Sequence, residues 1–433
     1  MHRHVCQLPD SETLKYFIQE ISLSDEGFQN LNRFVDALRI ALEDSPIAAF
    51  NVKVHPFGSL SNGLATFDSD LDIVLQFNKV LNQDDRLDFE TSLLILNIVK
   101  TILTMKLDVC RGMPRNVIVP SKRCPIIKID FKQCFQKDVK KWLMKNDNFN
   151  TDGPLAFNKC DISVTSTYGI HNSRLLKFLT LYDRRFYEMA LLLKYWAKKN
   201  VLICTEGFSS YAFMLMIIFF LQTREPMILP PISLLQKLAI DHPKKFKQTT
   251  VHGWKFGFAD DIAFVRKTVG CQENTQKTEQ LIPEFFHFYH KFDYSKMAIS
   301  TRLGILITKE ELFAEKKTKG LEMAFKESIV VIEDPFVLEH NPGSIFHGHY
   351  MPKWLGTLSK LTNNWNVDEK NVVPLLTDPN CWDPTPPPKS EANKERKAVL
   401  AALRKERKEK KKILSEQNAK KPSESDKNET GDL

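Results

Sequence analysis

The chain has 433 residues, a formal net charge of +8 and 42% hydrophobic residues, the composition of an ordinary globular protein with room for two or three domains. Its first residues lack the order of a secretory leader, and its longest apolar run, Tyr211 to Gln222, is too short to cross a bilayer. Because its eight cysteines include no Cys-x-x-Cys pair, a zinc module is disfavoured and a reducing compartment, cytoplasm or nucleus, is expected.

The first part of the chain mixes helical and strand patterns. Helices are predicted over residues 11–44 and 85–107. Apolar, β-branched runs predict strands at 48–57, 71–77, 116–120, 125–131 and 160–164. The polar stretch after Phe131, roughly thirty residues long, exceeds an ordinary connection and is interpreted as an insertion.

The second part is predominantly helical. Apolar periodicity predicts helices over 171–183, 184–200, 208–222 and 281–292. A Pro-rich break, Asp383 to Pro388, ends the predicted globular part. Residues 389–412 then carry eleven Lys or Arg against four Glu, a local charge of +7 out of the total of +8. The body is therefore nearly neutral, and any RNA-binding surface on it is expected to be a local patch.

The segment PFGSLSNGLATFDSDLDIVLQF carries the first chemical signal. Asp70 and Asp72 open a predicted strand, and residues two apart on a strand point to the same side. Two close carboxylates are costly unless cations neutralise them, and Mg²⁺ prefers such oxygen ligands. The turn at Gly58-Ser59 offers N–H groups and a hydroxyl to a phosphate. Together these residues predict metal-assisted phosphoryl transfer.

Two-metal nucleotidyl transfer needs a third carboxylate, which also helps to deprotonate the attacking hydroxyl. Asp130 ends the predicted strand PIIKIDF, and Asp161 opens the predicted strand CDISV. Spacing alone does not choose between them.

Several stretches in sequence resemble one family. They are FGSLSNGLATFDSDLDIVL, PIIKIDF, DISVTSTYGIHNSRLLKF, LLLKYWAKK, FSSYAFMLMIIFFLQ, GWKFGF, FFHFYHKFDY and IEDPFVLEHNPG. In this order they are similar to the template-independent RNA terminal nucleotidyltransferases, which comprise terminal uridylyltransferases and related poly(A) polymerases of the DNA polymerase β-like superfamily. The resemblance implies an α+β or α/β nucleotidyltransferase domain with a mixed sheet, a mostly helical second domain, and an active site in the cleft between them.

The resemblance also implies a division of the chain. The catalytic domain is expected over 45–165. The helical central domain is expected to combine 1–44 with 166–382, and to include a poly(A)-polymerase-associated region at about 280–346. Residues 383–433 form the Pro-rich break and a basic tail, either disordered or helical.

The resemblance assigns roles to individual residues. Its D-I-S strand, followed by H-N-S-R-L-L, makes Asp161 the third catalytic carboxylate beside Asp70 and Asp72, with Mg²⁺ or Mn²⁺ bound by all three. It places the triphosphate on Gly58 and Ser59 and the ribose 2′-hydroxyl on Asn172. The β- and γ-phosphates fall to Lys194 and Lys198, which share one helix face. The remaining nucleotide contacts fall to Ser210, Tyr211, Asp334 and His340.

The loop from Glu333 to Asn341 is expected to face the base. In the family, a histidine at the position of His340 marks uridylyltransferases, because it donates toward a uracil carbonyl and crowds out a purine. Val337 stands where the family often has an acidic residue, so Glu339 is a candidate to supply that group. Ser166 stands where many relatives have asparagine.

The expected activity is transfer of nucleotidyl groups, uridylyl above all, from an NTP to an RNA 3′ end. Alternatives are a poly(A) polymerase using ATP, an oligoadenylate-type synthetase, and an inactive RNA-binding scaffold. Because no RNA-recognition module is visible, target choice is expected to need a protein partner.

Overall fold

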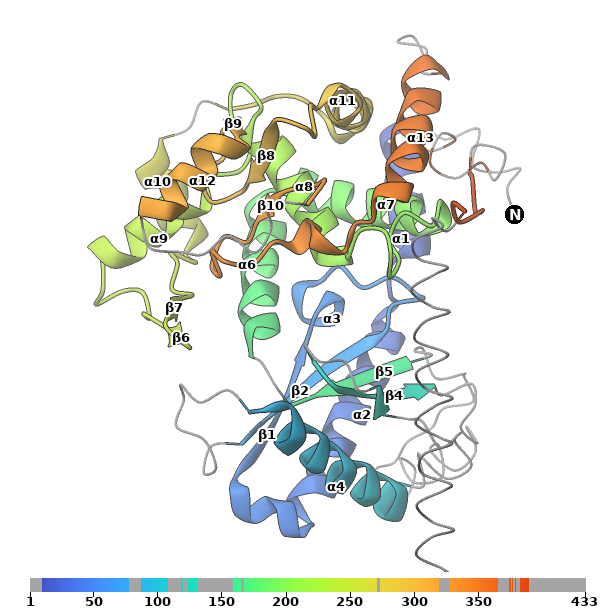
Figure 1. Ribbon diagram of the computed structural model, residues 1–433, viewed down its shortest axis with the longest axis vertical. Coiled ribbons are helices and arrows are strands. Elements are labelled where there is room, and N and C mark those ends of the chain that lie inside the picture. The colour runs from blue at the N-terminus through green and yellow to red at the C-terminus, as the bar shows by residue number, and fades with distance from the viewer. Residues whose placement is uncertain are drawn as a thin grey trace, which may run out of the picture.

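The computed structural model describes the sheet, its covering helices and most of a second, helical part (Figure 1). The described residues are 10–77, 87–107, 118–119, 124–130, 159–164, 167–270, 273–318, 328–364, 374, 376, 378 and 382–388. The predicted insertion after Phe131 and the basic tail lie outside them. None of the described helices is both long and apolar enough to span a membrane.

The first part is built on a mixed five-stranded sheet of order β1-β2-β5-β4-β3. Its strands are β1 (Val52–Phe57), β2 (Leu71–Phe77), β3 (Ile118–Val119), β4 (Ile126–Asp130) and β5 (Lys159–Ser163). Only β2 and β5 pair in parallel, and the other neighbours are antiparallel. This confirms the predicted mixed sheet. The interior strand β2 is almost wholly buried, as its apolar run predicted.

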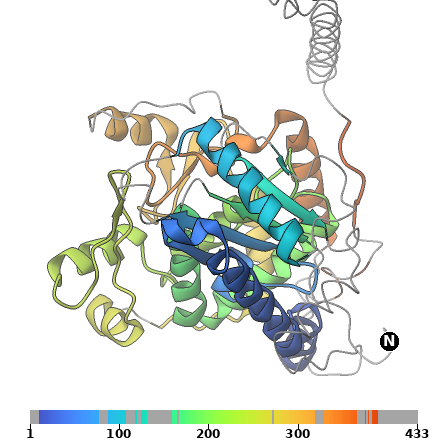
Figure 2. The same ribbon diagram turned by 90° about the horizontal axis from the view of Figure 1, so that it is seen from below.

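Two helices cover the sheet. They are α2 (Asp25–Glu43), which begins at an N-cap from Ser24, and α4 (Phe89–Leu107). Seen from below, both lie across the strands (Figure 2). Their apolar side chains form one core with those of the strands, including Leu38, Leu42 and Leu103, all inaccessible to solvent. This core holds the strand ends, and therefore the predicted carboxylates, in register.

The second part is mostly helical, as predicted. Its helices are α1 (Asp10–Ile21), α6 (Tyr168–Tyr182), α7 (Arg184–Lys199), α8 (Ser210–Gln222), α9 (Ile232–Asp241), α10 (Ile262–Val269), α11 (Thr278–Lys291), α12 (Lys309–Thr318) and α13 (Met351–Asn364). A short hairpin, β6 (Thr250–Val251) and β7 (Trp254–Lys255), and a small sheet of order β10-β8-β9 complete it. The small sheet comprises β8 (Met297–Ser300), β9 (Ile307–Thr308) and β10 (Ile332–Glu333). Helix α8 is apolar all round and forms the centre of this core.

The N-terminal segment is divided between the two cores. Side chains of α1 pack in the helical core, where Phe17 meets Tyr195 of α7 edge to face at 5.5 Å. Those of α2 pack under the sheet instead. We therefore redraw the proposed boundary: α1 belongs with the helical domain, and α2, which was expected there too, belongs with the catalytic domain.

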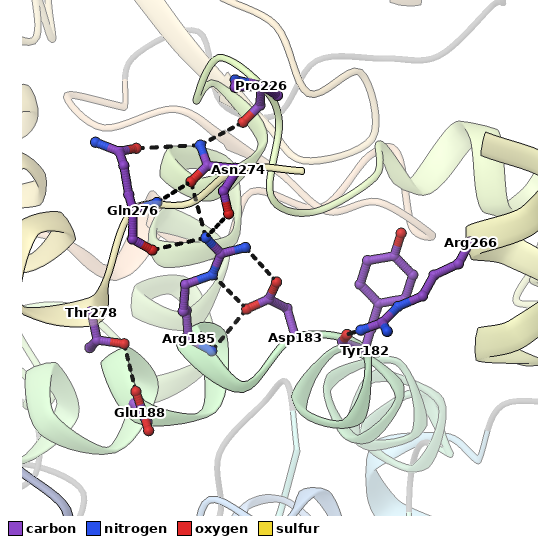
Figure 3. Close-up of polar contacts among 9 residues, drawn as sticks. All are labelled: Tyr182, Asp183, Arg185, Glu188, Pro226, Arg266, Asn274, Gln276 and Thr278. Atoms are coloured by element: carbon purple, nitrogen blue, oxygen red, sulfur yellow. Dashed lines mark hydrogen bonds and ion pairs between the residues drawn. The ribbon is translucent and has the colours of Figure 1, made fainter. Parts of the chain in front are cut away.

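A hydrogen-bonded hub ties the segment before α11 to the start of α7 (Figure 3). The guanidinium of Arg185 donates to the backbone carbonyls of Asn274 and Gln276 and to both carboxylate oxygens of Asp183, at 2.8 to 3.0 Å. The Asn274 amide donates in turn to the carbonyl of Pro226 at 2.8 Å. The planar guanidinium fork suits such divergent acceptors. The hub anchors α7, which carries two of the predicted phosphate-binding lysines.

Candidate active site

The carboxylates of Asp70, Asp72 and Asp161 meet at one edge of the sheet. Asp70 immediately precedes β2, and Asp72 is its second residue. Strand β5 runs parallel to β2 and sets Asp161 directly opposite Asp72. Cross-strand neighbours in register lie on the same face. The pairing thus brings together two residues 89 positions apart in sequence.

The electrostatics of this cluster are those of like charges held together. Burial raises the pKa of Asp72 to about 7, with further increases from Asp161 and Asp70, while Lys194 and Lys128 oppose the shift. Burial also raises the pKa of Asp161, and Asp70 adds to this effect against Lys128. Such electrostatic repulsion between neighbouring carboxylates is typical of sites that bind a cation.

The donor set fits a divalent metal. One oxygen of Asp161, Oδ1, is buried and accepts no hydrogen bond from a described residue, so a ligand for it is missing. Among the described residues, no group of three or more His, Cys, Asp or Glu side chains is placed so that it could hold a metal ion without substrate or water ligands. An open, carboxylate-only site suits Mg²⁺, which keeps several waters and takes its other ligands from substrate phosphates.

The strand register distinguishes the two predicted third carboxylates. Asp161 faces Asp72, whereas Asp130 on β4 stands opposite Lys159, two residue pairs farther along the strand. The residue of β4 that faces Asp161 is Lys128, whose ammonium lies 3.4 Å from its carboxylate. We therefore propose Asp161 for the catalytic role. Sequence reasoning missed Lys128, although it is a lysine inside the otherwise apolar start of β4.

Gly58 occupies a conformation that few other residues adopt. Its φ is +71°, and a Cβ atom built there would lie 2.4 Å from Oδ2 of Asp72. Its N–H, which was expected to meet the triphosphate, donates instead to Oγ of Ser173 on α6 at 2.7 Å. Gly58 therefore shapes the turn and lets Asp72 approach closely, and the contacts of Gly58 and Ser59 with a triphosphate stay predictions.

The two predicted phosphate-binding lysines both reach the segment before β2. The buried ammonium of Lys194 donates to the carbonyl of Leu64 at 3.0 Å. Burial lowers its pKa to about 7, Lys198 adds to this, and the acidic residues Asp68, Asp72 and Asp70 oppose it. Lys198 pairs with Asp68 at 3.1 Å. The two lysines thus lie on one face of α7, as their spacing predicted, and this face lies near the carboxylates.

Three further predicted nucleotide-binding residues differ in which hydrogen-bonding groups they could offer to a nucleotide. Oδ1 of Asn172 is buried without a partner among the described residues, so it can accept from a ribose hydroxyl. The buried hydroxyl of Tyr211 has no hydrogen bond of ordinary geometry, yet burial and the neighbouring Asp334 raise its pKa. Ser210 begins α8 and is exposed, while the capping bond of that helix comes from Ser209.

The predicted base-reading loop closes around Asp334. Its buried carboxylate accepts from the N–H groups of Phe336 and Val337, each at 3.0 Å, and Oδ2 lies 3.1 Å from Nδ1 of His340. Because a carboxylate only accepts, Nδ1 donates to it. Nε2 of the half-exposed imidazole can then donate to a uracil carbonyl only when the ring is doubly protonated. Glu339 is exposed, and Ser166 lies outside the described residues.

Comparisons with known proteins match both parts of the chain. The profile of the central palm domain of mitochondrial-like poly(A) RNA polymerase matches residues 11–180, and that of Cid1 family poly A polymerase matches 280–340. The chain is 29% identical over 335 residues to terminal uridylyltransferase cid1 of Schizosaccharomyces pombe, covering 75% of this chain and 71% of the relative. It is 28% identical to poly(A) RNA polymerase cid11 of the same yeast, covering 73% of this chain and 54% of the relative.

The fold has a counterpart among solved structures. A crystal structure of the Cid1 poly(U) polymerase matches with a TM-score of 0.60 at 24% identity, covering 82% of this chain and 94% of that chain. At this identity the likeness supports the fold, while the profiles and the named relatives identify the family. The chain belongs to the RNA terminal nucleotidyltransferases, among whose members are terminal uridylyltransferases and poly(A) RNA polymerases.

Proposed function

We propose that this chain adds nucleotides, with UTP as the preferred donor, to the 3′-hydroxyl of RNA without a template. The observation that carries the proposal is the pairing of Asp72 with Asp161 in register beside Asp70, at the edge where the Gly58 turn lies. The NTP, the RNA 3′-hydroxyl and the metal ions that neutralise the carboxylates could therefore meet at this end of the strands. The family membership supports the same reaction.

The residues divide the reaction between them. Asp70, Asp72 and Asp161 would hold two ions of Mg²⁺ or Mn²⁺, which when bound neutralise the charge that develops on the reacting phosphate. Asp161 accepts the proton of the RNA 3′-hydroxyl, whose oxygen then bonds to the α-phosphorus. The bond from that phosphorus to the bridging oxygen breaks, and pyrophosphate leaves toward Lys194 and Lys198. Catalysis here is positioning and charge neutralisation.

The nucleotide preference rests on His340. Replacing His340 with alanine opens room for a purine and removes a polar contact to uracil. We expect the ratio of kcat/KM for UTP to that for ATP to fall about tenfold, since one such contact discriminates by roughly 1–3 kcal/mol. Single-nucleotide primer extension measures the ratio. His287→Ala, an exposed histidine on α11, is the matched control and should leave it unchanged.

A poly(A) polymerase remains the second candidate, because Val337 stands in place of the acidic residue common in the family. Val337 is buried and only its N–H bonds to Asp334, so it offers no group to the base. If the wild-type chain prefers ATP, the uridylyl proposal is wrong and this alternative is correct.

The basic tail is proposed to bind RNA through phosphates. The segment before it is anchored: Lys353 donates to the carbonyls of Asp383 and Thr385, each at 2.6 Å. Truncation after Pro388 therefore spares these contacts. We expect the truncated protein to keep its rate on saturating RNA, to bind RNA more weakly at low salt, and to show a flatter salt dependence. Equal affinity and salt slope would leave a nuclear address as the alternative role.

The compartment, cytoplasm or nucleus, stays a prediction of the sequence, as does an RNA-targeting protein partner. A pull-down with the truncated and full-length chains from cell extract, treated with ribonuclease, would identify such a partner independently of the tail.

A further inference from the structure

A buried ionic network lies directly behind the predicted base-reading loop. Its centre is Glu333, which is inaccessible to solvent and immediately precedes Asp334. The carboxylate of Glu333 accepts from Nε of Arg302 at 3.0 Å and pairs with the ammonium of Lys316 at 3.3 Å. The hydroxyl of Ser300 donates to its second oxygen. Three partners on two segments, Ser300 and Arg302 on one and Lys316 on the other, thus fix the first residue of the loop.

The network is balanced in charge. Arg302 pairs with Glu315 of α12 at 2.5 Å as well as with Glu333, so two cations face two carboxylates. Lys316 is only 1% exposed, and burial lowers its pKa while Glu333 opposes the shift. A buried lysine is costly, and an apolar side chain of similar length would fill the same space without that cost. The ammonium must therefore provide something that an apolar side chain cannot.

What it provides is a donor to the loop. Nζ of Lys316 also donates to the carbonyl of Leu338, two residues before His340. From inside, the loop is closed by the bonds of Asp334 N–H to the His340 carbonyl at 3.2 Å and of His340 N–H to the Val337 carbonyl at 2.8 Å. Lys316 fixes the same loop from outside, and so joins α12 to the segment that carries the imidazole.

We propose that Lys316 is a positioning residue for base selection: by holding the Leu338 carbonyl and Glu333 together, it keeps the His340 imidazole against Asp334, with Nε2 directed at the base. This inference rests on the proposed function, because it acts through the role given to His340. It adds a helix outside the nucleotide contacts, α12, to the determinants of nucleotide choice. If the imidazole is displaced, kcat/KM should fall more with UTP than with ATP, because only the uracil contact depends on the imidazole.

The test is a double-mutant cycle read as nucleotide preference. Lys316→Met keeps the length and apolar stem of the side chain but removes the donor. We expect it to lower the UTP-to-ATP ratio of kcat/KM about fivefold, by analogy with the loss of one buried contact, while the rate with ATP changes little. Lys317→Met, an exposed neighbour on the same helix, is the matched control and should behave as wild type.

The cycle separates positioning from mere structural support. Because Lys316 acts through His340, Lys316→Met should lower the ratio no further in a His340→Ala background. An equal loss with both nucleotides, or an additional loss of preference in that background, would overturn the inference. A His340→Ala variant that itself keeps the wild-type ratio would instead refute the proposed role of His340.

A second variant covers the case in which Lys316→Met fails to fold. Lys316→Gln retains a donor beside Glu333 but is one bond shorter, so it cannot reach Leu338 as lysine does. It should show the same loss of preference. A wild-type ratio in folded Lys316→Gln would contradict the proposal.

Discussion

Replacing Asp72 or Asp161 with asparagine is expected to abolish RNA extension, with the single-turnover rate falling about a thousandfold or more. Asparagine preserves shape but removes the charge that holds a divalent ion, and such an ion contributes several kcal/mol to transition-state stabilisation. Asp130→Asn, at the end of the neighbouring β4, is the matched control and should extend RNA at the wild-type rate. Activity in Asp161→Asn with loss in Asp130→Asn would show that the third carboxylate is misassigned.

The same variants should not unfold the protein. The pKa of Asp72 predicts whether its replacement raises or lowers the unfolding free energy. Its pKa rises from 3.8 to about 7 on folding, so the folded chain holds the proton more tightly than the unfolded chain. The unfolding free energy of the metal-free wild type should therefore fall as pH rises from about 4 to 7. Asp72→Asn removes the part of this pH dependence that Asp72 contributes. Thermal melting at pH 7 in the presence of a chelator should show that the Asp72→Asn variant is at least as stable as the wild type.

Replacing Gly58 with alanine is expected to lower kcat about a hundredfold or more. The added Cβ would lie 2.4 Å from Oδ2 of Asp72, and φ of +71° strains any L side chain. Either the carboxylate or the turn must move, and a displacement near 1 Å at reacting groups costs about a hundredfold. Primer extension at saturating UTP measures the loss.

Gly253 offers the matched control. Its φ is +81°, but a Cβ atom there would meet nothing within 4 Å. Gly253→Ala thus carries the backbone strain without the collision, and should cost about 1 kcal/mol of stability with near-normal activity. Equal losses in the two variants would mean that strain, not approach to Asp72, explains the glycine.

The sequence predicted which residues are candidates for the chemistry better than it predicted the strand pairing that brings them together. The β-branched run after Asp70 predicted β2, and the alternation of strand side chains predicted that Asp70 and Asp72 point together. It could not choose between Asp130 and Asp161, because periodicity says nothing about which strands pair. The parallel register of β2 with β5 provides the information that spacing lacks.

Other differences have the same origin in long-range contacts. No local sequence pattern predicts that the N–H of Gly58 donates to Ser173, which lies 115 residues away. From the motif alone, this N–H was expected to bind a phosphate. The amphipathic pattern of residues 11–44 predicted helix correctly, but an apolar face does not specify the core in which it is buried. The role of Lys316 likewise depends on its contacts with Glu333 and Leu338, which no local sequence pattern indicates.

The most direct test of the central claim is extension of a short, end-labelled RNA by the purified full chain, with each of the four NTPs in turn and Mg²⁺ or Mn²⁺. The account predicts untemplated addition at the 3′ end, fastest with UTP, and no addition to an RNA that ends in a 3′-deoxynucleotide. Failure to extend the RNA with any NTP in either metal, by a protein that is folded and metal-supplied, would contradict it.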